Sequence, residues 1–213
     1  MMGKQVMVFV FVSLSFLVTV STTDSFAQSK SKTNPGKTKI TKINEKIDGL
    51  LKELKNSPAG QERVKILLEL AKIYQRTDPG QVLNYTNRAL ALSEKINNPK
   101  GIADSLHMLG VYYYYQDSYP RALEYYSKSL KINEELGDRK GIADRYNNIG
   151  RVYRKQGNYF LALEYYFKSL KIYEELGDRK GIASNYNNIG IVYMEQGNYL
   201  LALEFYFKSL KIC

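Results

Sequence analysis

The sequence predicts an all-α fold, a solenoid of antiparallel helix hairpins stacked one after another. From Lys100 onward the chain repeats every 40 residues, and Asp138–Ile172 differs from Asp178–Ile212 at only seven of 35 positions. Apolar residues recur within each period at the three- and four-residue spacing of one helix face. A period of this length indicates helical units that bury their apolar faces against their neighbours, so we expect function on a repeated surface.

The first 27 residues have the features of a secretory signal peptide. Lys4 precedes an apolar run at residues 6–20, and Ser25-Phe26-Ala27 is a cleavage site with small residues at both ends. Cleavage would leave Gln28 as the first residue of an exported protein, periplasmic or extracellular. An uncleaved membrane anchor is the alternative, but the apolar run is shorter than the roughly 20 residues of a spanning helix.

The net charge is +10, and residues 30–55 supply about half of the surplus. Such a stretch could contact an acidic envelope surface or nucleic acid. We favour a solvated linker followed by the polar face of a helix, and we expect no nucleic acid partner. Cys213 is the only cysteine, which excludes a disulfide framework and a thiolate metal cluster.

Two segments precede the repeats. Residues 28–39 are rich in Ser, Lys, Thr, Asn, Pro and Gly, and we predict that they form a flexible basic linker. Residues 40–56 are predicted to form an N-terminal capping helix, because their apolar side chains share one stripe, made of Ile40, Ile43, Ile47, Leu50, Leu51 and Leu54.

Four helical hairpins follow, in units at residues 58–99, 100–139, 140–179 and 180–213, the last of them truncated inside its second helix. The predicted helices span residues 64–74, 82–96, 102–115, 119–136, 142–156 and 159–176, and the first helix of unit four starts at residue 182. Gly137 suits a left-handed residue after a helix, and Asp138 suits the N-cap of the next helix. Gly150 is predicted to face Ala162, so that the paired helices approach closely.

Units two to four share a set of marks: Leu109-Gly110, Tyr113, Ala122, Tyr126 and Ser129; Ile149-Gly150, Tyr153, Ala162, Tyr166 and Ser169; and Ile189-Gly190, Tyr193, Ala202, Tyr206 and Ser209. This pattern resembles the tetratricopeptide repeat, from residue 58 to the C-terminus. The resemblance implies a right-handed α-solenoid that binds a protein or peptide in its concave groove. Because the usual period is about 34 residues, the longer period resembles a long-helix subclass and the exported sensory arrays of bacterial signalling proteins.

In such arrays the first helix of each hairpin lines the concave groove. Four of the seven differences between units three and four fall on the expected groove face, at positions 144/184, 151/191, 154/194 and 155/195. The residues that we expect to bind a partner are Tyr114, Asn147, Asn148, Arg151, Arg154, Lys155, Asn187, Asn188, Ile191 and Met194. Arg151, Arg154 and Lys155 would form a basic patch for an acidic segment, beside apolar Ile191 and Met194. Chance drift of surface positions is the alternative explanation of the differences.

Two features of this face have alternative explanations. Asn148 and Asn188 could hold the backbone of an extended peptide, because an amide donates and accepts at once, or they could bond across adjacent units. Tyr114 and Tyr115 follow the packing residue Tyr113 and could form an exposed hot spot, or they could be buried against the next unit.

We expect an exported scaffold that binds a protein or peptide, and no enzyme. His107 is the only histidine and has no Ser, Cys or second His placed beside it, so no catalytic residue, cofactor or metal is expected. The alternative is the sensory N-terminal part of a histidine kinase, nucleotide cyclase or transcription regulator, with its membrane and catalytic parts beyond residue 213. The last unit, whose apolar face has no following neighbour, could also pair with another chain.

Overall fold

The computed structural model describes residues 35–212, with side chains from residue 41. The predicted signal peptide, linker residues 28–34 and Cys213 lie outside the described residues, so the expectations for them stay predictions. All regular structure in the described part is helical: α1 (Pro35–Asn56), α2 (Gln61–Tyr74), α3 (Pro79–Lys95), α4 (Pro99–Tyr115), α5 (Tyr119–Glu135), α6 (Arg139–Lys155), α7 (Tyr159–Leu176), α8 (Arg179–Glu195) and α9 (Tyr199–Ile212). The predicted all-α class is confirmed.

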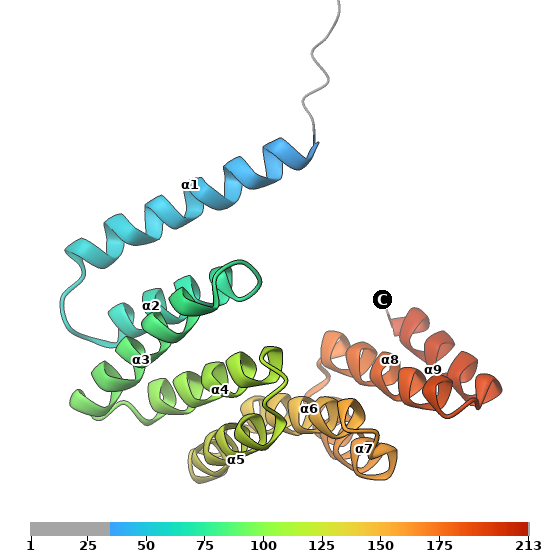
Figure 1. Cartoon of the computed structure of the whole chain (residues 1–213). Coiled ribbons are helices and arrows are strands. Elements are labelled where there is room, and N and C mark those ends of the chain that lie inside the picture. The colour runs from blue at the N-terminus through green and yellow to red at the C-terminus, as the bar shows by residue number, and fades with distance from the viewer. Residues whose placement is uncertain (1–34, 213) are drawn as a thin grey trace, which may run out of the picture.

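The helices after α1 form antiparallel hairpins, α2–α3, α4–α5, α6–α7 and α8–α9, which stack into a curved array (Figure 1). Each second helix also packs against the first helix of the next hairpin. The helices α2, α4, α6 and α8 lie along the inner side of the curve, and α5 and α7 lie along its outer side. The array is therefore the predicted solenoid, with its concave surface on the first helices.

The ends of the helices follow the predicted punctuation. Asp138 accepts a hydrogen bond from the backbone N–H of Gly141 at 2.9 Å and so caps α6. Gly137 has a φ of 65°, the left-handed conformation that ends a helix most easily with glycine. Both features recur one unit later at residues 177–181. The helices α6 and α8 begin three residues before the predicted starts, because their capped first turns are polar and add nothing to the apolar pattern.

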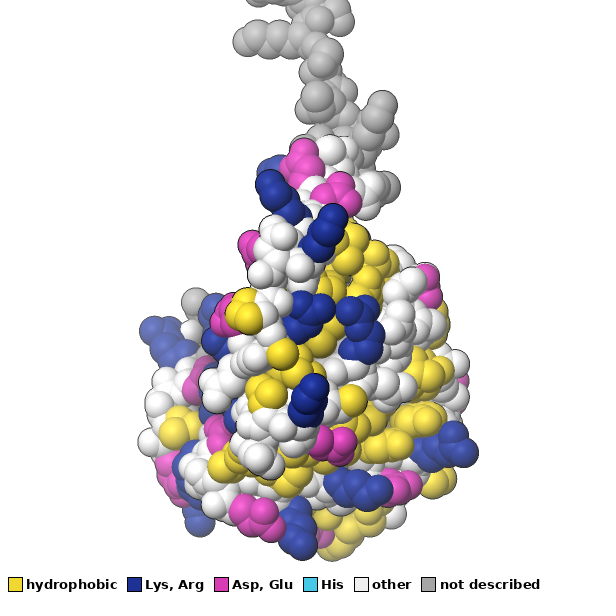
Figure 2. All heavy atoms as spheres, turned by 90° about the vertical axis from the view of Figure 1, so that its left-hand side faces the viewer, with side chains coloured by type: hydrophobic (Ala, Val, Ile, Leu, Met, Phe, Trp, Pro, Cys, Tyr) yellow, Lys and Arg dark blue, Asp and Glu magenta, His cyan; other side chains and the backbone are white. Residues whose placement is uncertain are grey.

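The helix α1 begins at Pro35, inside the predicted linker and five residues before the predicted start of the helix. Proline suits a first helical position, because the N–H that it lacks would have no partner there. Leu50 and Leu54 are buried, whereas Ile43 and Leu51 are exposed. The C-terminal half of α1 therefore covers the first hairpin, and the rest projects from the body of the protein with exposed lysines along it (Figure 2).

Inside each hairpin after the first, a glycine of the first helix meets a tyrosine ring of the second. A Cβ atom added at Gly150 would lie 2.9 Å from the ring of Tyr166 and 3.1 Å from the carbonyl oxygen of Ala162. The equivalent glycines of units two and four meet the equivalent tyrosines in the same way. The close approach predicted at Gly150 is present, but its first partner is the aromatic ring rather than the side chain of Ala162.

The outer end of the array exposes apolar side chains on α9. Leu210 is 68% exposed, whereas the equivalent Leu170 on α7 is 6% exposed because it packs against α8. Leu200, Leu203 and Phe207 are exposed on α9 as well. These four α9 residues share one helix face, which we call the open face of α9, and no helix of the described part covers it.

Candidate binding groove

The predicted groove residues lie on the first helices of units two to four. Of the ten, Asn147, Asn148, Arg151, Arg154, Lys155, Asn187, Asn188, Ile191 and Met194 are half-buried or exposed, and Tyr114 alone is buried. They recur one turn apart along α6 and α8, so they share the concave face. The structure brings nine of the ten to a surface that a ligand could reach.

A chain of amide hydrogen bonds joins units three and four across this face. Nδ2 of Asn188 donates to Oδ1 of Asn147 at 3.3 Å, and Nδ2 of Asn147 donates to Oδ1 of Asn185 at 3.0 Å. Asn148 makes the corresponding contact with unit two, where its Nδ2 lies 2.9 Å from Nε2 of His107. The two asparagines predicted either to hold a ligand or to bond across units thus do bond across units.

The predicted basic patch is partly neutralised by its neighbours. Arg154 forms an ion pair with Glu195 of the next unit, with Nη1 2.5 Å from the carboxylate. The guanidinium of Arg151 lies over the ring of Tyr114, 4.8 Å from its centroid, in a cation–π contact. Lys155 is exposed and has no ion-pair partner in the part of the chain that the structure describes. Positions 154 and 195 both differ between units three and four, so some of these differences serve to join the units.

The two tyrosines that end α4 have different surroundings. Tyr114 is 8% exposed and packs beneath Arg151, which is the burial that we considered as the alternative to a hot spot. Tyr115 is 43% exposed, and its ring meets that of Tyr114 edge to face at 5.4 Å. Of this pair, Tyr115 is the side chain that a ligand could contact, although Tyr114 was the one predicted to bind.

Arg145 is a buried charge between units two and three that was not predicted from the sequence. Arg145 donates through Nε to Oγ of Ser129 at 2.8 Å and through Nη2 to Oδ1 of Asp104 at 3.1 Å. Burial lowers the pKa of Arg145, and Asp104 opposes that effect. In unit four Asn185 takes the same place and donates to Oγ of Ser169 at 3.1 Å. A signal existed, because positions 145 and 185 also differ between the two copies.

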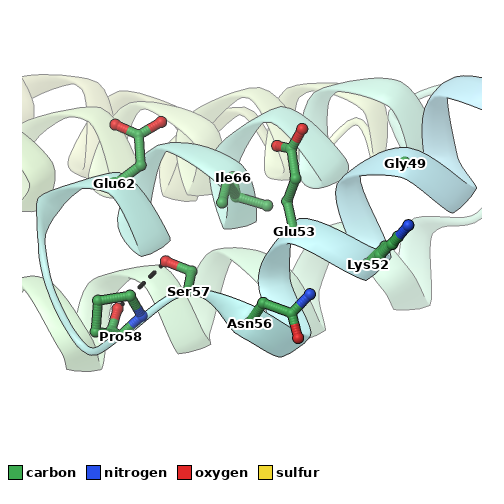
Figure 3. Close-up of a pocket in the computed structure, with 8 residues that line it drawn as sticks. All are labelled: Gly49, Lys52, Glu53, Asn56, Ser57, Pro58, Glu62 and Ile66. Atoms are coloured by element: carbon green, nitrogen blue, oxygen red, sulfur yellow. Dashed lines mark hydrogen bonds between the residues drawn. The ribbon is translucent and has the colours of Figure 1, made fainter.

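Three hollows lie along the N-terminal half of the array, within the described residues. One of about 370 Å³ lies on the concave surface between α2 and α4. A second, of about 350 Å³, includes Arg76, Tyr112 and Tyr115 at the C-terminal ends of the same helices. A third, of about 650 Å³, lies between α1 and α2, where Glu53 and Glu62 point to the same side (Figure 3). Hollows with both polar and apolar lining residues therefore lie outside the set of predicted residues.

Family models of the tetratricopeptide repeat match the chain at residues 103–136 and at residues 142–213. Residues 103–136 and 142–213 therefore consist of tetratricopeptide repeats. The matched residues include the glycine–tyrosine contacts of units two to four. No curated protein matches the sequence.

Several solved structures share this fold. BtubC (BKLC) from P. vanneervenii is 21% identical with a TM-score of 0.65, over 84% of this chain and 74% of that one. A Rap protein complexed with competence and sporulation factor is 20% identical with a TM-score of 0.73, over 83% of this chain and 51% of that one. A signal transduction ATPase with a tetratricopeptide repeat sensor, from Pyrococcus horikoshii, is 21% identical with a TM-score of 0.68, over 83% of this chain and 28% of that one. At these identities the likeness shows the fold, and this chain spans only part of each protein.

Tetratricopeptide repeat arrays present extended concave surfaces for binding. In this array that surface carries amide groups, exposed cations and tyrosine rings rather than clustered metal ligands. Within residues 35–212, no three His, Cys, Asp or Glu side chains are grouped where they could hold a metal ion. Among the described helices, none is both long enough and apolar enough to cross a membrane.

Proposed function

We propose that this tetratricopeptide repeat protein is an exported scaffold that binds a protein or peptide along its concave groove. One contrast between units three and four carries the proposal. The charged residues of the outer face repeat unchanged, with Lys168–Glu164 and Lys208–Glu204 ion pairs at 2.5 and 2.6 Å. The concave face differs at four of its positions, as expected of a surface that contacts an irregular ligand. Export rests on the predicted signal peptide.

The charge of the groove favours an acidic segment as the partner. Three cations are exposed on this side, Lys72 of α2, Arg76 in the turn after α2, and Lys155 of α6. None of the three forms an ion pair within the described residues. The carboxylates of Asp104 and Glu195 on the same side are already paired with arginines. The charge left for a ligand is therefore positive, and affinity should fall as salt rises.

The concave surface can be tested against the outer surface of the same protein. Purified protein would capture partners from an envelope extract, in parallel with an Arg151→Ala, Arg154→Ala, Lys155→Ala variant. The matched control removes three lysines of the outer face, Lys168, Lys171 and Lys208. A partner that the control retains and the groove variant loses supports the proposal. Equal capture by both variants at low salt contradicts it.

A second candidate is the sensory part of a larger signalling protein. The Pyrococcus horikoshii ATPase, whose repeats are described as a sensor, has the same fold over a part of its length. The nucleotide sequence after codon 213 decides between the two roles. A membrane span followed by a catalytic domain establishes the sensory role, and an immediate stop codon removes it.

We also propose self-association through the open face of α9, because Leu200, Leu203, Phe207 and Leu210 are exposed together there. Sedimentation at increasing concentration should show a growing dimer fraction that Phe207→Lys abolishes. A monomer across the whole range contradicts the idea.

A further inference from the structure

A hollow on the concave surface lies apart from the residues predicted from the sequence. Its volume is about 370 Å³, and it is lined by Lys65, Leu68, Glu69 and Lys72 of α2 and by Asp104, His107 and Met108 of α4. We call it the α2–α4 pocket. It opens on the same side of the array as the groove of units three and four, because both are lined by first helices.

Two side chains, Arg151 and Asn148, fix which ring nitrogen of His107 carries the proton. Nη1 of Arg151 donates to Oδ1 of Asn148 at 3.3 Å, and arginine can only donate, so the amide oxygen must face Arg151. The amide nitrogen of Asn148 then faces Nε2 of His107 at 2.9 Å. Because an amide nitrogen also only donates, Nε2 must accept. In a neutral ring the proton therefore lies on Nδ1.

The surroundings of His107 favour the neutral imidazole in the folded protein. Burial lowers the pKa of His107 well below its usual 6.5, and the nearby cations Arg145, Lys100, Lys72 and Arg151 lower it further. The ring also packs at 5.8 Å against the ring of Tyr126, which fixes its orientation. Nδ1–H has no hydrogen-bond partner among the described residues. The pocket is thus lined by a residue with a fixed, unused donor.

The charges around the pocket leave a positive excess. Glu69 is paired with Lys46 of α1 at 2.7 Å, and Asp104 is paired with Arg145 at 3.1 Å and with Lys100 at 3.2 Å. The cations of these pairs all lie outside the set that lines the pocket. The carboxylates of Glu69 and Asp104 are therefore neutralised by cations that do not line the pocket.

The lysines of the pocket are less fully paired. Lys65 contacts Glu62 at 3.1 Å in a pair that is exposed at both ends, and such pairs are weak. Lys72 is exposed and has no ion pair in the described part of the chain. A ligand in the α2–α4 pocket would meet one free ammonium group and one neutral N–H donor.

We propose that the α2–α4 pocket binds a carboxylate, the side chain of an Asp or Glu in the acidic segment that the groove is proposed to bind. Nδ1–H of His107 would donate to one carboxylate oxygen, and Nζ of Lys72 would provide the opposing charge. Leu68 and Met108 would contact the methylene groups of the side chain. One cation and one neutral donor match a single negative charge. The inference rests on the proposed function, and it places a ligand subsite in units one and two.

The single histidine allows a direct test, because every imidazole signal belongs to His107. Long-range ¹H–¹⁵N spectra of the full protein should show the Nδ1–H tautomer. The probe is acetylated, amidated hexaglutamate, with hexaglutamine as its uncharged control. Hexaglutamate should shift the His107 ring signals with saturation, and hexaglutamine should not. The Nε2–H tautomer in the free protein, or ring signals that hexaglutamate leaves unmoved, would overturn the proposal.

Matched variants separate the subsite from general charge effects. Lys72→Ala should weaken hexaglutamate binding about tenfold at low salt, as expected for the loss of a charge-assisted hydrogen bond, whereas Lys168→Ala on the outer face should not. Asn148→Asp has only acceptors, so it should move the proton to Nε2 and weaken binding. Asn188→Asp, which adds the same charge one unit away, should leave the tautomer unchanged. Equal effects of the paired variants would refute the subsite.

The same titration distinguishes this inference from the proposed function. If backbone amide signals of α6 and α8 move while the ring signals of His107 do not, the proposal of a binding groove stands and the proposed carboxylate subsite is refuted. If only the ring signals of His107 move, the carboxylate subsite stands and the basic patch of unit three is refuted as a binding site. A phosphate-bearing ligand would be indicated instead if inorganic phosphate competed with hexaglutamate at lower concentration than acetate does.

Discussion

Arg145 and Asp104 form an ion pair that joins unit three to unit two, with Nη2 of Arg145 3.1 Å from Oδ1 of Asp104. Arg145 is 3% exposed, whereas the carboxylate of Asp104 reaches the concave surface and also contacts Lys100. The equivalent of Arg145 is Ser105 in unit two and Asn185 in unit four, and both are buried. One buried position thus holds a different polar side chain in each unit. In units three and four this side chain bonds to the preceding unit, whereas Ser105 bonds to a carbonyl group of its own helix.

Removing the carboxylate of this pair should destabilise the array strongly. Asp104→Asn leaves the buried guanidinium without its counter-charge, and the expected loss is about 2–3 kcal/mol of unfolding free energy in urea. Arg145→Asn, the residue of unit four, removes the charge as well and should cost less. Glu124→Gln breaks a fully exposed pair with Lys128 and should leave the unfolding free energy close to that of the unaltered protein. A loss in Asp104→Asn as small as in Glu124→Gln would show that the junction does not depend on the pair.

The contact between Gly150 and Tyr166 should not tolerate a methyl group. A Cβ atom at Gly150 would lie 2.9 Å from the ring, so Gly150→Ala should destabilise by about 1–3 kcal/mol through overpacking. Gly49 is a helical glycine with no atom within 4 Å of an added Cβ, so Gly49→Ala should be neutral or stabilising by up to about 1 kcal/mol. Thermal unfolding of both variants measures the difference. Two changes of the same sign and size would mean that helix propensity decides both.

The fold was predictable because its signals are local and repeated. Gly137 and Asp138 mark a helix junction by their chemistry, and apolar spacing marks each helix. Contacts between units were less predictable, because residues about 40 positions apart meet only when the curvature of the array is known. Arg145 appeared as one more charge on a helix, yet the neighbouring unit buries it. Arg154 appeared as part of a ligand surface, yet Glu195 of the next unit pairs with it.

Acid should destabilise the protein through His107 before it affects the carboxylates. The folded pKa of this imidazole lies well below 6.5 because of burial, whereas the unfolded chain binds a proton near pH 6.5. Between these values the unfolded state holds more protons, so stability falls as the pH drops below about 6.5, by at most about 1.4 kcal/mol per pH unit. His107→Asn should lose this slope. The urea midpoint measured from pH 7.5 to 5 checks it, and identical pH profiles for the two proteins would contradict the prediction.

Arg154 and Glu195 offer a way to separate stability from binding. Glu195→Gln breaks their ion pair, which is partly exposed, so unfolding free energy should fall by less than about 1 kcal/mol. The freed guanidinium would then face the groove, and on the proposed function the affinity for hexaglutamate should rise about threefold at low salt. Glu204→Gln frees Lys208 on the outer face and changes the net charge by the same amount, so it is the matched control. Calorimetric titration of both variants gives the comparison. If Glu204→Gln raised the affinity equally, the gain would reflect long-range charge rather than a groove contact.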